Sequence, residues 1–314
     1  MTKKIGIITE NFYIPWKPDD IDNFVAGSQE SVIFIAEELV KNGYTVVVFS
    51  HGPVKTETVK RKEVLYTDLI DTNYEFFDTL ILFKVNPFKV LPKTNLIYWS
   101  ADTEIVNNIS KRVCLTHFHA QMNDWKDAYV IPLGVNIKSL NENKTEKDEY
   151  MVLYSSCPNR GLKTLIHDWT RIKSFFPNLK LYVTYGFQIL KQITTNLQIA
   201  ENSQNYLQEL CEKLNITFLP NLKRNDFEKL YWKAKYWILP LNQAKSELFC
   251  LNAVKAQYCG CIPIVNKIGA LTETVGDYIE YKDFCNGSLA VTKGDNKVPL
   301  FEWSEVVKEW EKLF

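Results

Sequence analysis

The strongest constraint in this sequence is a repeated alternation of short β-branched and aromatic runs with longer segments of helical period. Such alternation is typical of folds in which crossover helices join parallel strands. In the first half it predicts a helix over 29–42 and strands over 4–9, 45–50, 79–83, 95–99 and 112–116. In the second half it predicts strands over 150–155, 180–184, 216–219, 236–239 and 262–265, and helices over 161–175, 204–214, 225–235 and 249–260. We therefore expect an α/β protein with two doubly wound domains in tandem.

The length and the charge balance narrow the class of protein. At roughly 100–200 residues per domain, 314 residues suffice for two domains that each bury a core. Lys and Arg together number 37, as do Asp and Glu, so the chain lacks the basic field that a nucleic-acid binder needs. The apolar runs fall far short of the ~20 residues that span a bilayer, and residues 1–8 lack signal-peptide features. We expect a cytoplasmic protein with no nucleic-acid partner.

The cysteines and histidines do not form a metal-binding pattern. Seven cysteines are scattered through apolar segments without paired couplets, which favours reduced and mostly buried thiols. The four histidines form no His-Glu-x-x-His array. We expect neither a metal nor a cofactor.

A charged stretch over 141–149 that lacks apolar residues is the predicted linker. It separates a first domain over 1–140 from a second over 150–290. In the terminal segment 300–314, Trp303 and Trp310 recur at helical spacing opposite a mainly acidic face. We expect this helix to pack on the body of the protein, and peripheral membrane contact is not indicated.

In open α/β sheets, ligands bind at the carboxyl ends of the strands, so the loops there are the candidate sites. The first strand is followed by a long loop that ends at Gly27 and Ser28, without the Gly-x-Gly-x-x-Gly turn of a dinucleotide-binding enzyme. Gly27 either lets a ligand approach the start of the first helix or is a plain helix-entry glycine.

The loop that opens the second domain gathers a serine hydroxyl, an arginine and a helix start, at Ser156, Arg160 and Gly161. Together these groups suit a phosphate or diphosphate. An arginine that is merely exposed at a helix start is electrostatically unfavourable there, which favours the ligand interpretation. A later loop carries Ser246 and Glu247 before a helix; Glu247 is either a helix cap or an acceptor of hydrogen bonds from a polyol.

Several of these motifs occur in an order that resembles the retaining glycosyltransferases of family four. They are Ala26-Gly27-Ser28-Gln29, Val130-Ile-Pro-Leu-Gly134-Val, Ser156-Cys-Pro-Asn-Arg160-Gly161-Leu162, Pro177-Asn-Leu-Lys-Leu-Tyr-Val, Tyr231 to Ala234, Leu239-Pro240, Ser246-Glu247-Leu-Phe249-Cys250, Ala256, Gly260, Pro263 and Gly269 to Glu273. The resemblance spans essentially the whole chain and is most specific in the second half. It implies the GT-B fold, in which two Rossmann-like domains face each other across a cleft. It also implies that the 300–314 helix packs back on the first domain, the acceptor side, while the second holds the donor.

The resemblance implies roles for individual residues. Arg160 matches the basic residue that neutralises the donor diphosphate, and Glu247 matches the first glutamate of the Glu, seven residues, Glu motif, which holds the donor sugar. The full donor-binding set is expected to comprise Arg160, Ser155, Ser156, Gly161, Lys163, Leu248, Phe249, Cys250 and Lys255. Gly27 and Ser28 resemble the family's glycine loop. The reaction is expected to be independent of metal and to use a UDP- or GDP-linked sugar.

The sequence departs from the family pattern at three positions. Lys255 stands where the second glutamate is expected, and we expect it to pair with Glu247 or to contact phosphate. Ser155 stands where a second basic residue is expected, and Ala101 replaces the histidine of a His-Asp pair that ends in Asp102. His117 either substitutes for that histidine or is a buried structural residue. The expected catalytic set is therefore Glu247, His117 and Asp102.

The resemblance implies transfer of a hexosyl or pentosyl group, with retention of configuration, to a hydroxyl of a glycan, lipid-linked or protein-linked acceptor. The alternative is a catalytically impaired glycosyltransferase-like protein that binds ligands or acts as a scaffold, which the three departures favour. A GT-B epimerase or phosphorylase is a weaker third hypothesis.

Overall fold

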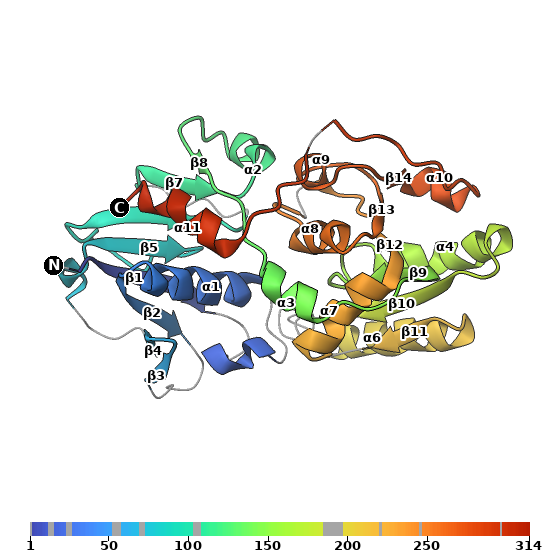
Figure 1. The fold of residues 1–314 in the computed structure, drawn as a ribbon, viewed down its shortest axis with the longest axis horizontal. Coiled ribbons are helices and arrows are strands. Elements are labelled where there is room, and N and C mark those ends of the chain that lie inside the picture. The colour runs from blue at the N-terminus through green and yellow to red at the C-terminus, as the bar shows by residue number, and fades with distance from the viewer. Residues whose placement is uncertain are drawn as a thin grey trace. The chain divides into compact units, whose positions relative to one another are not determined.

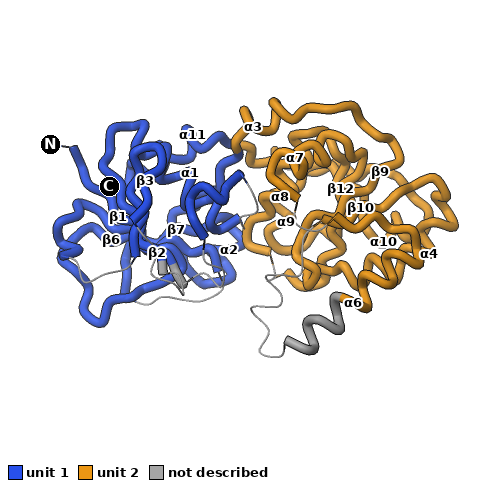
Figure 2. The backbone as a smooth tube through the Cα atoms, turned by 90° about the horizontal axis from the view of Figure 1, so that it is seen from below, with its two compact units in different colours: residues 1–135, 301–314 blue, residues 136–300 orange. Residues whose placement is uncertain are grey.

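The chain divides into two compact units (Figure 2). Unit 1 comprises residues 1–135 and 301–314, and unit 2 comprises residues 136–300. The computed structural model describes residues 2–11, 16–22, 27–51, 58–68, 73–102, 108–184, 197–219, 222–244, 247–295 and 297–314.

The central feature of unit 1 is a sheet whose described strands are ordered β3-β4-β2-β1-β5-β6-β7-β8. The strands are β1 (Lys4–Asn11), β2 (Thr45–His51), β3 (Val59–Arg61), β4 (Val64–Thr67), β5 (Thr79–Phe83), β6 (Asn95–Trp99), β7 (Lys111–Cys114) and β8 (Tyr129–Val130). β3 and β4 pair antiparallel, and the other pairings among these strands are parallel. The central strands are buried on both faces, which explains their continuous apolar runs.

The helices and short 3₁₀ turns of unit 1 complete its layers. They are η1 (Pro18–Asp22), α1 (Gly27–Lys41), η2 (Tyr74–Phe76), α2 (His117–Met122) and α11 (Trp303–Glu311). Beyond the end of α1, Gly43 has a φ of 91°, the left-handed conformation that commonly ends a helix.

The terminal helix α11 contacts α1 although the two are far apart in sequence (Figure 1). The Trp303 ring stacks on Phe34, with ring centroids 6.0 Å apart, and Trp310 meets Trp99 edge-on at 5.0 Å. Gly134 lies directly under Trp303, where a Cβ atom would collide with the indole. The aromatic face of α11 is therefore part of the core of unit 1.

Unit 2 contains a second sheet, whose described strands are ordered β11-β10-β9-β12-β13-β14 and pair in parallel. The strands are β9 (Asp148–Tyr154), β10 (Lys180–Thr184), β11 (Thr217–Leu219), β12 (Ala234–Leu239), β13 (Ile262–Val265) and β14 (Ile279–Glu280). The helices are α3 (Ile137–Glu142), α4 (Leu162–Phe175), α6 (Leu197–Lys213), α7 (Arg224–Lys233), α8 (Leu251–Tyr258), α9 (Leu271–Thr274) and α10 (Tyr281–Cys285). The predicted α/β construction with two doubly wound units is thus confirmed.

The predicted linker over 141–149 is wrong, because this segment lies inside unit 2. The chain enters unit 2 at Asn136, and the charged side chains that suggested a linker have partners there. The Lys147 ammonium donates to the carbonyls of Ala234 and Cys259 at 2.9 and 2.7 Å, and Glu149 pairs with Lys235 at 2.8 Å.

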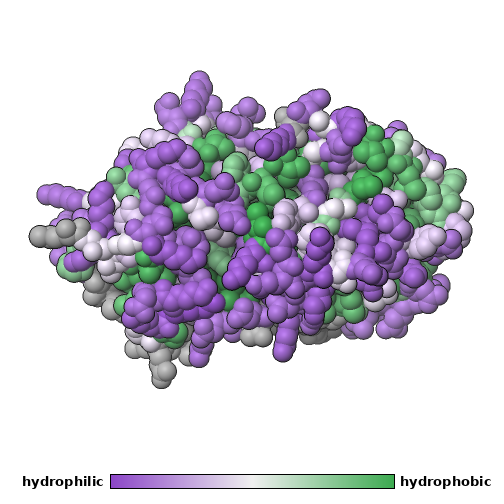
Figure 3. Space-filling model, viewed as in Figure 1, coloured by the Kyte–Doolittle hydropathy of each residue, from purple (hydrophilic) through white to green (hydrophobic). Residues whose placement is uncertain are grey.

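The surface in Figure 3 is mainly hydrophilic, with smaller apolar patches between the charged side chains. Among the residues that the structure describes, no helix is both long and apolar enough to cross a membrane.

Candidate functional site

Each sheet has one point at which the strand order reverses, and ligands of open α/β folds bind at the carboxyl ends of the strands there. In unit 2 the chain builds β9, β10 and β11 in one direction and then places β12 on the other side of β9. The loops that follow β9 and β12 therefore meet at this point. They carry Arg160 and Glu247, respectively.

The loop after β9 forms a tight turn that packs closely against the loop after β12. The Tyr154 hydroxyl and the Arg160 amide both donate to the Cys157 carbonyl, at 2.7 and 2.8 Å. Gly161 follows with a φ of 94°, and a Cβ atom there would collide with the carbonyl oxygen of Pro240, just beyond β12. Glycine is therefore required both for this turn and for the close approach of the two loops.

The loop after β12 is held by the segment that follows β13. The Asn266 side chain donates to the Leu241 carbonyl at 2.8 Å. Gly269, with a φ of 59°, leaves room for the Ala244 carbonyl, and the Glu247 amide donates back to that carbonyl at 3.5 Å. These contacts fix the backbone that presents Glu247.

Arg160 and Glu247 form an ion pair, with Nη1 and Oε2 3.6 Å apart. Their side chains are 31% and 17% exposed, so the pair is partly desolvated but reachable from solvent. Burial raises the pKa of the Glu247 carboxyl to about 7, although the Arg160 guanidinium opposes that rise. The pair presents a cation beside a carboxylate that is readily protonated, which suits a ligand with both phosphate and hydroxyl groups.

Ser155 does not belong to this accessible surface. It is fully buried, its hydroxyl accepts a hydrogen bond from Trp237 Nε1 at 2.9 Å, and it lies 3.4 Å from the Tyr231 hydroxyl. Tyr231 in turn donates to Asn252 at 2.8 Å, and the Asn252 amide donates to the Ser155 carbonyl at 2.7 Å. Ser155 therefore joins β9, β12, α7 and α8 in a buried hydrogen-bond network, and its expected contact with a donor stays a prediction.

The helix after Glu247 begins at Leu251 rather than at the predicted 249, with Cys250 as its N-cap. Leu248, Phe249 and Cys250 are buried in the approach to this helix. Lys255 is also buried. Burial raises the pKa of the Cys259 thiol to about 12, and the Lys255 ammonium is among the charges that oppose this rise. Arg160 is the ion partner of Glu247, and Lys255 lies in α8, the helix that follows Glu247.

The remaining residues of the predicted donor-binding set differ in exposure. Ser156 is buried, whereas Lys163 is exposed in the first turn of α4. Gly27 is exposed at the start of α1, and a Cβ atom there would meet nothing within 4 Å. The fold itself therefore does not require glycine at position 27. Ser28 is half-buried beside it, and Ala26 and Ser246 lie outside the described residues.

In unit 1 the carboxyl ends of β6 and β7 bring Asp102 next to His119. His119 Nε2 lies 3.2 Å from the Asp102 carbonyl and 3.1 Å from the Ser100 hydroxyl, and its Nδ1 accepts from the Leu115 amide at 3.4 Å. Burial lowers the pKa of His119. The ring is thus neutral with its proton on Nε2, and it supports the turn that carries Asp102.

His117, the histidine that the sequence analysis selected, is exposed at the start of α2. The interpretation of His117 as a buried structural residue is therefore wrong, and that description fits His119. Thr116 is the sequence feature that distinguishes the two histidines. It is the N-cap of α2, and its hydroxyl accepts a hydrogen bond from the His119 amide at 3.1 Å. A Thr N-cap defines the helix start and with it which side chains of the first turn face the sheet.

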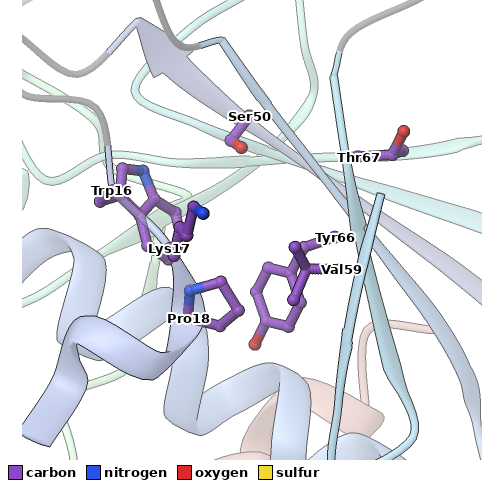
Figure 4. Close-up of a pocket in the computed structure, with 7 residues that line it drawn as sticks. All are labelled: Trp16, Lys17, Pro18, Ser50, Val59, Tyr66 and Thr67. Atoms are coloured by element: carbon purple, nitrogen blue, oxygen red, sulfur yellow. The ribbon is translucent and has the colours of Figure 1, made fainter. Parts of the chain in front are cut away.

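A small pocket opens at the same edge of unit 1, near the ends of β2 and β4 (Figure 4). Trp16, Lys17, Pro18, Ser50, Val59, Tyr66 and Thr67 line it. The Trp16 and Tyr66 rings meet edge-on, with centroids 6.1 Å apart. No sequence motif marks these residues, because they come from four separate segments of the chain.

No group of three or more His, Cys, Asp or Glu residues in the described ranges is arranged to hold a metal ion. At the carboxyl ends of the strands in each sheet, a cation is instead paired with a carboxylate.

The two sheets, which are parallel except at β3 and β4, define an α/β protein with two doubly wound units, and the sequence assigns the family. A sequence model described as "Glycosyl transferases group 1" matches residues 136–297, which is more than half of the chain. The chain therefore belongs to the group 1 glycosyltransferase family, as the resemblance implied. No curated protein sequence matches the chain significantly.

Solved structures share the fold at low sequence identity. AviGT4, a glycosyltransferase involved in avilamycin A biosynthesis, aligns with a TM-score of 0.66 and 12% identity over 99% of this chain and 96% of its own. Sucrose-phosphate synthase from Thermosynechococcus elongatus gives 0.64 and 14%, over 99% and 98%. Anabaena Alr3699/HepE in complex with UDP-glucose gives 0.61 and 12%, over 98% and 89%. These similarities establish the GT-B fold.

Proposed function

We propose that this chain transfers a sugar from a nucleotide-sugar donor to a hydroxyl acceptor, with retention of anomeric configuration and without a metal ion. The observation that carries the proposal is the Arg160–Glu247 pair at the switch point of unit 2. The matched family segment contains both residues. A UDP-linked donor is favoured because structures of similar fold were solved with UDP-glucose and with UDP-2-fluoro glucose.

The two side chains have complementary roles in this reaction. The Arg160 guanidinium, partly buried, offers a fork of donors to the diphosphate and stabilises the charge that develops as it departs. The Glu247 carboxylate accepts hydrogen bonds from hydroxyls of the donor sugar. The segment 248–250, which leads into the N-terminus of α8, adds a positive backbone potential on the same side.

The chemical step forms a bond between the acceptor oxygen and the anomeric carbon while the bond from that carbon to the diphosphate breaks. Both events take place on the same face of the sugar, which retains the configuration. The acceptor hydroxyl proton passes to the departing diphosphate oxygen. Because no side chain becomes covalently attached, the role of the protein is to orient the groups and to stabilise charge.

The test is binding and turnover with purified wild type, Arg160→Gln and Arg171→Gln. Arg171 is the matched control, because it is an exposed arginine on the adjoining α4 that pairs with Asp168. UDP binding by calorimetry should weaken roughly tenfold or more in Arg160→Gln, since a charge-assisted contact is lost, and stay unchanged in Arg171→Gln. Release of nucleoside diphosphate from a panel of UDP- and GDP-sugars measures turnover, and the anomeric proton coupling of the product in NMR reports retention. UDP binding by Arg160→Gln at wild-type strength would contradict the proposal.

The second candidate is a glycosyltransferase-like protein that binds the donor without turnover. The burial of Ser155 and Lys255 favours it, because the family pattern places donor-binding groups at both positions and both are buried here. Donor binding without nucleotide release from any sugar of the panel would identify this alternative.

A further inference from the structure

Lys84 is a charged residue at the switch point of unit 1 that the sequence analysis did not select. It directly follows β5, whose Phe83 pairs with Thr9 of β1, and the strand order of unit 1 reverses between β1 and β5. Lys84 therefore lies at the end of β5, the first strand beyond the reversal in unit 1. The loop that carries Glu247 has the equivalent place in unit 2, after β12.

The backbone of Lys84 is in a conformation that favours glycine. Its φ is 61°, and its amide donates to the Trp99 carbonyl at 3.0 Å, which fixes the turn between β5 and β6. A residue with a Cβ atom loses stability in this conformation, and such strain is concentrated at functional sites. Glycine would adopt this conformation with less strain, and the lysine at this position has a specific side-chain partner.

That side chain pairs with Asp102. Nζ and Oδ2 are 3.2 Å apart, and the lysine side chain is 11% exposed while the aspartate side chain is 47% exposed. The ammonium is thus largely enclosed, whereas about half of the carboxylate side chain is exposed to solvent. The Ser100 hydroxyl donates to the Asp102 carbonyl at 3.2 Å, and neutral His119 supports the same carbonyl, so the turn that presents the carboxylate is held in place.

We propose that Lys84 and Asp102 bind two neighbouring hydroxyl groups of a sugar. The Asp102 carboxylate accepts a hydrogen bond from one hydroxyl, and the Lys84 ammonium donates to the oxygen of the next. Because the charges of the pair balance, the site favours a neutral diol over an anion. Charge-assisted hydrogen bonds of this kind are stronger than neutral ones. The inference rests on the proposed function, which supplies two such sugars: the glycosyl group of the donor and the acceptor.

The test compares Lys84→Gly, Lys84→Met and Asp102→Asn with the control Lys41→Met. Lys41 is an exposed lysine of unit 1 that pairs with Glu38. Lys84→Gly relieves the backbone strain, so its melting temperature should equal or exceed that of Lys84→Met. The probes are UDP-glucose, followed by calorimetry and by its hydrolysis without acceptor, and methyl α-D-glucopyranoside, followed by saturation-transfer NMR.

We expect all three variants, but not the control, to weaken sugar recognition about tenfold or more while UDP alone binds as in wild type. Weaker binding and slower hydrolysis of UDP-glucose would assign the diol to the donor. A weaker methyl glucoside signal with unchanged hydrolysis would assign it to the acceptor. Wild-type behaviour of Lys84→Gly toward both sugars would overturn the inference, and the proposed function would stand if Arg160→Gln still lost UDP. A wild-type chain that recognises neither sugar would overturn the inference, whereas the proposed function is decided separately by the panel of UDP- and GDP-sugars.

Discussion

The guanidinium of Arg160 lies 3.6 Å from the carboxylate of Glu247, at the ends of two strands that are neighbours in the sheet but far apart in the sequence. A cation can bind the diphosphate of a nucleotide sugar, and a carboxylate beside it can accept hydrogen bonds from the hydroxyls of the sugar. The pair also has consequences for stability, because burial of Glu247 is only partly offset by Arg160.

Glu247 should make the stability of the protein dependent on pH. Its pKa in the fold is about 7, above the ordinary value of 4.5, so the folded chain retains a proton that the unfolded chain loses between these values. The unfolding free energy attributable to Glu247 therefore falls as pH rises through this window, by an amount on the order of 3 kcal/mol. Urea denaturation at pH 4.5, 6 and 8 measures it, as the difference between wild type and Glu247→Gln.

Glu309→Gln, at an exposed glutamate that pairs with Lys312, is the control and should follow the wild-type pH dependence. If wild type and Glu247→Gln lost stability in parallel between pH 4.5 and 8, the raised pKa of Glu247 would be refuted.

Gly161→Ala should destabilise the protein and disturb the Arg160 loop. An alanine with a φ of 94° is strained by about 1–3 kcal/mol, and its Cβ atom also collides with Pro240. Gly27→Ala is the matched control for stability, since it begins a helix and has open space around it. Its melting temperature should be unchanged or higher, whereas that of Gly161→Ala should fall together with UDP affinity. Equal melting temperatures for the two variants would contradict this account.

Ser155→Arg should not restore the second basic residue of the family pattern. Because Ser155 is fully buried in a hydrogen-bond network, an arginine there has no route to solvent and should prevent folding. Ser155→Ala is the milder variant, and it should lower the unfolding free energy by about 1–3 kcal/mol by leaving Trp237 Nε1 without its acceptor. Soluble Ser155→Arg with stronger UDP binding would show that position 155 faces the donor.

Trp310→Ala should destabilise unit 1 by about 3–5 kcal/mol, because the indole is 1% exposed and packs against Trp99. Lys308→Ala, an exposed change on the same helix, should have little effect. Urea denaturation of both variants measures the difference. A loss for Trp310→Ala no larger than that for Lys308→Ala would mean that α11 is not part of the core.

Much of the fold could be predicted because it depends on local patterns. The predicted strands around 79–83, 95–99, 180–184 and 262–265 are confirmed, since continuous apolar runs mark strands buried on both faces. The short strands β3, β4, β8 and β14 were missed, because two to four residues are too few to show the period of a strand. Arg160 and Glu247 were identified as candidates because each follows a strand. In a parallel sheet the loops after neighbouring strands lie at the same edge, even when the strands are far apart in the sequence.

What the sequence by itself determined is the order of the elements and the chemistry that each loop offers. Which side chain of a loop reaches solvent was decided only by the tertiary structure. Ser155 and Arg160 share one loop, yet Trp237 and Asn252 from other elements enclose the first and leave the second accessible. Likewise His119 rather than His117 supports Asp102, and Lys84 meets Asp102 only because β5 and β6 are neighbours. Burial and pairing depend on what packs against a residue from distant parts of the chain, and that information is absent from any local pattern.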